Sequence, residues 1–333
     1  TDPTHVTLNI STVGSPAGLK NITITNPDGQ TATGNNLINI TTVSPAPCED
    51  FTTVTFPPSS FTVEFTGTNY WSRSTVSAYG SGSGSAKFAF YDAGPTLPIV
   101  QSLVSNNFAN TVANTYLTFD EAYAPYTSEG PDTLLVEASN NLGGSYSILA
   151  TLLGKVDGTG ELNTAPATGS SFTPVNTQWR PKIYSLPVGT NKVRLRAKSG
   201  YGNNLYLDNV CVQVLSAPVS GFLGLTPQGF YRGTPSIFSG IGDTVTIYLH
   251  RADLPNIKVD STTLLIDAFT TTIPTFSRAL SGTYYFEVKH RNSIETWSKA
   301  GGEAYSRGSL FTFDFLQVNE AFNNNQYQVN VPN

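Results

Sequence analysis

The feature that most constrains the fold of this chain is a series of short segments in which apolar and polar residues alternate. Clear examples are residues 5–10, 20–25, 244–250 and 281–291. Because successive side chains of a β-strand point to opposite faces of a sheet, this period of two is typical of strands with one buried face. Turn residues punctuate the pattern, as in Asn-Pro-Asp-Gly at 26–29. No segment of useful length has the period of an amphipathic helix, so we expect an all-β protein.

The composition of the chain argues against two classes of partner, nucleic acids and the membrane interior. The 333 residues carry only 12% charged side chains and a formal net charge of −5. The 18 lysines and arginines do not gather in runs, so the electrostatic footprint of nucleic-acid binding is missing. No apolar stretch reaches the roughly 18 residues of a spanning helix, so we expect no membrane insertion. The length predicts two or three domains, and the lack of Met indicates a processed piece of a secreted protein.

Residues 1–46 contain too little chain for a complete sandwich. Strands are expected at 5–10, at 20–25 and near 37–42, with the Asn-Pro-Asp-Gly turn at 26–29. This pattern resembles the end of an IPT/TIG-type immunoglobulin-like domain, in which such a turn joins late strands. A sandwich of this kind needs about seven strands, and this segment has room for three or four. Either the front half was removed, or the missing strands come from another molecule.

Residues 47–216 follow a Ser-Pro-Ala-Pro linker at 44–47 and carry an ordered set of motifs. The block opens with Cys-Glu-Asp-Phe at 48–51, contains Tyr-Trp at 70–71, and closes with Tyr-Leu-Asp-Asn-Val-Cys-Val at 206–212. This order resembles the MAM-like jelly-roll domain, also called choice-of-anchor J, of secreted bacterial surface proteins that include type IX secretion cargo. The resemblance implies a two-sheet jelly roll whose first and last strands lie side by side.

The same resemblance brings the only two cysteines, Cys48 and Cys211, close together. We expect them to form a disulfide, because the composition is typical of extracellular proteins and both residues lie at the ends of one block. Two buried free thiols are the alternative.

The resemblance also implies a structural calcium ion. In related jelly rolls, an acidic residue of the first strand and an Asp of the last strand share one cation, and hard oxygen ligands of this kind suit Ca²⁺. The matching positions are Glu49 or Asp50 and Asp208, with Asp92 as a third candidate. The alternative is that these acids are solvated strand ends.

Catalytic residues are not apparent. The three histidines, His5, His250 and His290, all lie outside residues 47–216, and none has a nucleophile motif or a zinc-ligand spacing. Pairs of carboxylates suit glycosidases. The candidates for such a pair are Asp120, Glu121, Asp132 and Glu137. Adjacent residues of a strand, such as Asp120 and Glu121, face opposite sides of a sheet and therefore cannot act together on one substrate. We therefore expect that the protein is not an enzyme.

Aromatic side chains near turns are candidates for a glycan-binding surface. We assign this role to Tyr123, Tyr126 and Tyr201, and expect Trp71 and Trp179 to lie in the core because they fall within strands.

Residues 217–333 resemble a small Ig-like or prealbumin-like sandwich. The sequence therefore predicts a central jelly-roll β-sandwich flanked by Ig-like segments. Two functions remain open. The first is a non-catalytic extracellular structural or adhesive protein of the cell surface, which binds copies of itself or other surface proteins and includes the case of a fibre subunit. The second is a carbohydrate-binding module of a larger secreted hydrolase.

Overall fold

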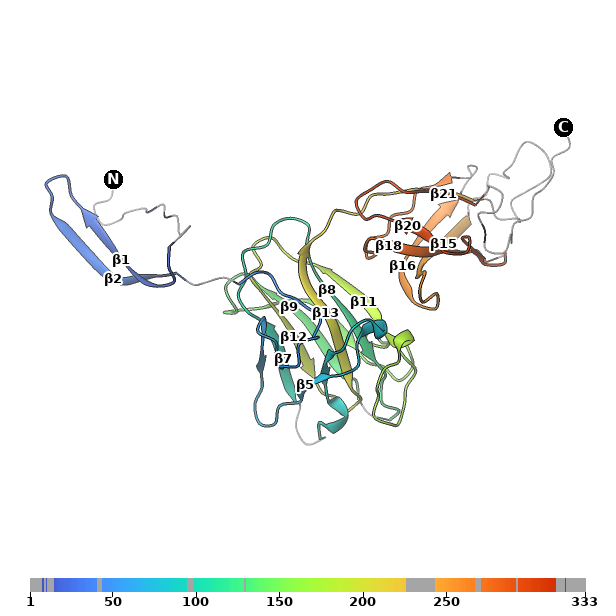
Figure 1. Ribbon diagram of the computed structural model, residues 1–333, viewed down its shortest axis with the longest axis horizontal. Coiled ribbons are helices and arrows are strands. Elements are labelled where there is room, and N and C mark those ends of the chain that lie inside the picture. The colour runs from blue at the N-terminus through green and yellow to red at the C-terminus, as the bar shows by residue number, and fades with distance from the viewer. Residues whose placement is uncertain are drawn as a thin grey trace.

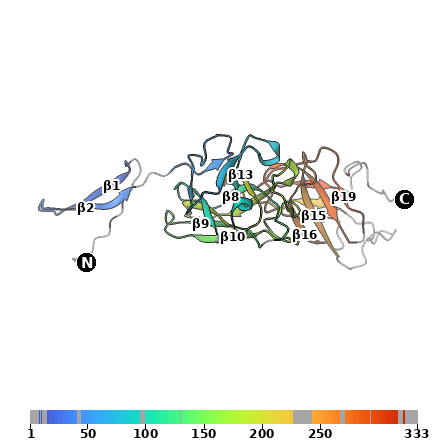
Figure 2. The same cartoon turned by 90° about the horizontal axis from the view of Figure 1, so that it is seen from below.

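The computed structural model describes residues 8, 10, 15–40, 44–94, 99–128, 130–225, 243–266, 271–291, 293–315 and 321. In this part of the chain, helix is confined to three 3-10 turns: η1 (Ala78–Gly80), η2 (Phe90–Asp92) and η3 (Asn176–Gln178). The prediction of an all-β fold is confirmed. A hairpin, a central sandwich and a C-terminal pair of sheets follow one another along the molecule (Figure 1), and the view from below has the same order (Figure 2).

The N-terminal hairpin consists of β1 (Gly18–Thr25) and β2 (Thr31–Ile40), which pair antiparallel. The Asn-Pro-Asp-Gly turn closes it, with the Gly29 N–H donating to the Asn26 carbonyl over 2.9 Å. The second strand starts directly after the turn and is longer than the predicted strand at 37–42. The predicted strand at 5–10 lies mostly outside the described residues. Neither β1 nor β2 contains a fully buried residue.

The central block is a sandwich of two antiparallel sheets. The five-stranded sheet has the order β10-β9-β12-β7-β4, and its strands are β4 (Phe61–Glu64), β7 (Val100–Ser105), β9 (Thr133–Ser139), β10 (Ser147–Leu153) and β12 (Lys192–Lys198). The other sheet has the order β11-β8-β13-β6-β5, with β3 on β13, and its strands are β3 (Cys48–Glu49), β5 (Trp71–Ser74), β6 (Ser85–Phe88), β8 (Thr115–Tyr123), β11 (Arg180–Ser185) and β13 (Leu205–Val214).

Alternating residues of these strands fill the space between the two sheets. Leu117 and Phe119 of β8 point into the same core as Leu134 and Val136 of β9. Trp71 joins this core, in agreement with the sequence prediction. Every second residue of strands such as β8 and β9 is buried because the opposite sheet covers one face of each strand. This is the alternation from which the strands were predicted.

The C-terminal part contains a sheet of order β16-β15-β18-β19, with β20 on β18, and a smaller sheet of order β17-β14-β21. The strands are β14 (Phe222–Gly224), β15 (Asp243–Arg251), β16 (Lys258–Ile266), β17 (Thr271–Thr272), β18 (Gly282–Lys289), β19 (Thr296–Trp297), β20 (Glu303–Tyr305) and β21 (Thr312–Asp314). Aromatic rings form much of the core, including the stacked pair Phe286 and Phe311, whose centroids are 5.8 Å apart.

The loop between β15 and β16 packs onto the outer face of the jelly roll. Ile257 is fully buried there, and Leu254 lies beside it. The jelly-roll side chains of this cluster are Ala78, Tyr79, Ala122, Ala124, Phe172, Trp179 and Tyr206. The guanidinium carbon of Arg251 lies 3.9 Å from the centre of the Tyr79 ring, a cation–π geometry. Trp179 is therefore buried as expected, although partly by a neighbouring domain. No helix in the described residues is long and apolar enough to cross a membrane.

Candidate functional site

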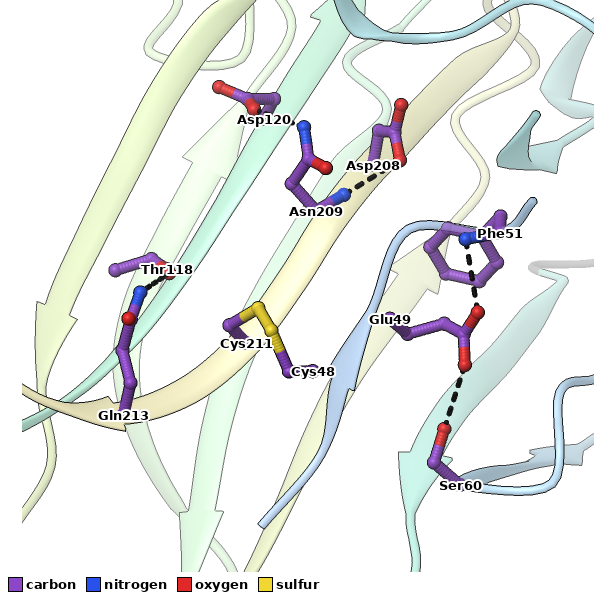
Figure 3. Close-up of a disulfide and its surroundings, with 10 residues drawn as sticks. All are labelled: Cys48, Glu49, Phe51, Ser60, Thr118, Asp120, Asp208, Asn209, Cys211 and Gln213. Carbon is purple, nitrogen blue, oxygen red and sulfur yellow. Dashed lines mark hydrogen bonds between the residues drawn. A yellow bond between two sulfur atoms is a disulfide. The ribbon is translucent and has the colours of Figure 1, made fainter. Parts of the chain in front are cut away.

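The first and last strands of the jelly roll are joined covalently. Cys48 of β3 lies directly opposite Cys211 of β13 in the antiparallel pair, and the two form a disulfide (Figure 3). The disulfide prediction is confirmed, and the bond closes a loop with a sequence separation of 163 residues. The pairing of β3 with β13 also agrees with the expectation that the two end strands lie side by side.

Two of the predicted calcium ligands cap their own chain segment. The Glu49 carboxylate accepts hydrogen bonds from the Phe51 N–H at 3.0 Å and from the Ser60 hydroxyl at 3.1 Å (Figure 3). Asp50 accepts bonds from the backbone and hydroxyl of Thr52, and these bonds lower the pKa of Asp50. Both Glu49 oxygens and one Asp50 oxygen thus accept bonds from nearby donors.

Asp208 of β13 lies opposite Asp120 of β8 in the strand pairing, and the two carboxylates belong to one cluster. A β-bulge falls between Asp208 and Cys211, and Asn209 within it adopts a φ of 52°. The Asp208 carboxylate accepts bonds from the N–H groups of Ala78 and Asn209, both at 2.7 Å. Asp120 accepts one bond from the Tyr79 hydroxyl and one from the Asn209 side-chain amide, both at 2.8 Å.

The predicted calcium ligands Glu49, Asp50 and Asp208 accept hydrogen bonds from protein groups in this structure. Glu49 and Asp208 bind different protein donors (Figure 3), and Asp92 is an exposed residue of η2. No group of three or more His, Cys, Asp or Glu side chains in the described ranges is arranged to hold a metal ion. Calcium binding stays a prediction, which a melting curve with and without chelator checks.

The Asp208 cluster makes stability depend on pH. Burial, followed by the charges of Asp120 and Asp50, raises the pKa of Asp208 to about 7. Burial also raises the pKa of Asp120. A carboxyl with a raised pKa binds its proton more tightly in the folded state. Its stabilising effect is therefore present below the unfolded pKa of about 4 and is lost as the pH rises toward 7.

We expect the urea midpoint of unfolding to fall as the pH is raised from about 4 to about 7. Asp208→Asn removes one titrating group and should reduce this fall. Asp157→Asn, at an exposed carboxylate bonded only to Thr159, is the matched control. A midpoint that rises over this window in the unmodified protein would contradict the assignment.

The other paired carboxylates are also bonded to protein groups. Glu121 forms a 2.8 Å ion pair with Lys182, and burial raises its pKa to about 7. Glu137 pairs with Arg194 at 2.6 Å and Arg196 at 2.8 Å. Adjacent Asp120 and Glu121 thus have different partners, as their positions on opposite faces of β8 require.

One predicted glycan contact is wrong. The Tyr123 ring is 1% exposed, because it points into the core from the same face of β8 as Leu117 and Phe119, and its hydroxyl donates to Asp132 at 2.9 Å. The alternation of buried and outward-facing residues along this strand already indicates that Tyr123 is buried. Tyr126 is half-buried against exposed Tyr91, with ring centroids 5.9 Å apart.

Tyr201 remains accessible, with 38% of its surface exposed at a φ of 63°. It lies in a loop held by Asp132, which accepts bonds from the N–H groups of Gly200 and Gly202. The exposed Tyr201 side chain therefore extends from a loop whose backbone is held on both sides by hydrogen bonds.

An apolar groove on the N-terminal hairpin was missed from the sequence. Its volume is about 470 Å³. Its lining residues are Leu8, Ile10, Ser15, Pro16, Lys20, Asn21, Ile22, Ile38 and Ile40. The alternation at 20–25 had marked the apolar face of one strand, but a groove needs the second strand and residues 8 to 16 as well.

No protein-family model matches this chain, and no curated protein matches it. Solved structures to which this chain is similar include the K2 cleaved adhesin domain of Lys-gingipain, with 16% identity and a TM-score of 0.37, covering 50% of this chain and 96% of that one. The K1 cleaved adhesin domain from Porphyromonas gingivalis has 18% identity, a TM-score of 0.36, and coverage of 51% and 99%. TmCBM61 in complex with β-1,4-galactotriose has 12% identity, a TM-score of 0.31, and coverage of 50% and 94%.

Likeness at this level says nothing about function. The β-sandwich architecture rests on the strand pairings described above, and the resemblance to MAM-like domains stays a prediction.

Proposed function

We propose that the protein is a non-catalytic extracellular structural subunit that assembles with copies of itself through the β1–β2 hairpin. The observation that carries this proposal is the apolar groove on that hairpin. The disulfide between Cys48 and Cys211 supports an oxidising, extracellular environment.

The hairpin has the properties of an incomplete domain. A two-stranded sheet alone is marginally stable in water. Among the described residues, β1 and β2 pair only with each other, and Leu19 and Leu37 are 58% and 63% exposed. Unpaired strand edges of low charge favour pairing with another chain. Residues 15–40 contain only two charged side chains, Lys20 and Asp28.

A second copy that adds a strand to the hairpin would pair its free strand edge and cover its exposed apolar side chains. Strand addition pairs the free backbone groups of an edge, and apolar side chains of the added strand cover the exposed face. The groove-lining Ile22, Ile38 and Ile40 are the residues that such a strand would bury.

The test compares two charge insertions on the hairpin. Ile38→Asp places a charge in the groove and should abolish assembly. Thr33→Asp adds the same charge at an exposed position of β2 whose side chain contacts Thr23, and should leave assembly intact. Analytical ultracentrifugation and electron microscopy measure the outcome. An unmodified protein that stays monomeric at all accessible concentrations would refute the proposal.

Glycan binding is the second candidate function. The exposed Tyr91, its partner Tyr126 and the exposed Tyr201 favour it, because aromatic faces of this kind stack on sugars. A glycan array with the unmodified protein and a Tyr201→Ala variant distinguishes it from assembly. Binding that depends on Tyr201 supports this function, and an array without signal excludes it for the glycans tested.

A further inference from the structure

We propose that residues 326–331 of one copy are the strand that fills the groove on the β1–β2 hairpin of the next copy. This inference rests on the proposed assembly function and names the donor of the missing strand. It joins the apolar groove near the N-terminus with a strand-like sequence near the C-terminus.

The donor segment has the pattern of a half-buried strand. Its sequence is Gln-Tyr-Gln-Val-Asn-Val, in which Tyr327, Val329 and Val331 alternate with amide side chains. In an extended conformation these three side chains point to one face, and Gln326, Gln328 and Asn330 point to the other.

The groove matches this segment in its spacing and polarity. Ile38 and Ile40 are two residues apart and therefore lie on the same face of β2, where they pair with Lys20 and Gly18 of β1 and line the groove together with Ile22. A donor strand beside them presents apolar side chains with the same spacing. The donor segment carries no charge, and the only charged residue of the groove is Lys20, so no like charges meet.

The arrangement of the domains favours contact between copies. Ala321, the last described residue, bridges Ser298 in the C-terminal part. Ten further residues reach Val331, a span of at most about 35 Å. The jelly roll lies between the hairpin and the C-terminal sheets in both views (Figures 1 and 2). Ala321, from which the chain continues to this segment, therefore lies in the part of the molecule beyond the jelly roll from its own groove.

Head-to-tail contact of this kind leads to a chain of subunits. The donor and the groove are different surfaces, so a pair of copies still has one free donor and one free groove after the first contact forms. A filament grows unless the rotation between neighbours closes a ring.

The first experiment places one charge on either face of the donor segment in the full chain. Val329→Asp should weaken association about a hundredfold or more, because a carboxylate loses its water in a groove lined mostly by apolar side chains. Gln328→Asp, one residue away on the opposite face, should assemble as the unmodified protein does. Both variants should melt at the same temperature as the unmodified protein, which excludes unfolding as the cause.

The second experiment traps the contact itself. A chain with Ile38→Cys and Val329→Cys should form disulfide-linked ladders of oligomers under oxidising conditions, and Thr33→Cys with Val329→Cys should not. Cross-linked monomers alone would show that the segment binds its own hairpin and would overturn the inference.

The outcomes separate this inference from the function on which it rests. If Ile38→Asp abolishes assembly but Val329→Asp does not, assembly through the groove stands and another strand occupies it. If the unmodified protein does not assemble, the proposed function fails first.

Discussion

Replacing Cys48 and Cys211 together by serine is expected to lower the free energy of unfolding of the jelly roll by about 2–5 kcal/mol. The disulfide closes a loop with a sequence separation of 163 residues, and long loops lose the most chain entropy when they are cross-linked in the unfolded state. Strands β3 and β13 would then be held together by their backbone pairing alone, and β3 contains only two residues. Urea unfolding followed by tryptophan fluorescence measures the change.

Reduction of the unmodified protein is the control for this prediction. It breaks the same bond without changing the sequence, and it should shift the urea midpoint to that of the double serine variant. A variant with the midpoint of the oxidised protein would show that the disulfide contributes nothing to stability.

Replacing Asp132 by alanine is expected to cost about 3 kcal/mol or more. The Asp132 side chain is fully buried, and burial raises its pKa to about 6. Its two oxygens accept four bonds, from the backbone of Gly200, Gly202 and Asn203 and from the Tyr123 hydroxyl. Alanine leaves three N–H groups without this acceptor, two of them buried and that of Gly200 partly buried, and each buried group costs about 1 kcal/mol or more.

A matched control uses an acid whose bonds are local. Asp157→Ala removes an exposed carboxylate that binds only Thr159, and should change stability by less than about 0.5 kcal/mol. Thermal and urea unfolding compare the two variants. Equal stability of Asp132→Ala and Asp157→Ala would mean that the 200–203 loop does not depend on the buried carboxylate.

The strands and much of the core were predictable because their signal is local. Alternation along β8 identifies Leu117 and Phe119 as buried, and the same count places Tyr123 beside them. The disulfide was predictable through the resemblance, which depends on the order of motifs. Hydrophobic patterning works for these features because one face of each strand meets the opposite sheet.

The hydrogen-bond partners of the predicted calcium ligands depend on information that the sequence does not contain. Asp208 and Glu49 lie on neighbouring strands, as expected, but a β-bulge at Asn209 directs the last strand's polar groups toward Ala78 and Asp120. Bulge positions depend on how two strands are matched in three dimensions. The hairpin groove could not be predicted from the sequence for a similar reason, since separate segments of the chain line it together.

The position of the disulfide has a consequence for mechanical load. The chain enters the jelly roll just before Cys48 and leaves it just after Cys211, so the bond joins the entry and the exit. A pull on the two ends of a subunit therefore passes through one covalent bond, and most strands of the sandwich lie outside the path of the force. In a force–extension measurement, the jelly roll should lengthen only after reduction. In a filament built from such subunits, the disulfide would carry the tension across each jelly roll, and the β-sheets would not be loaded.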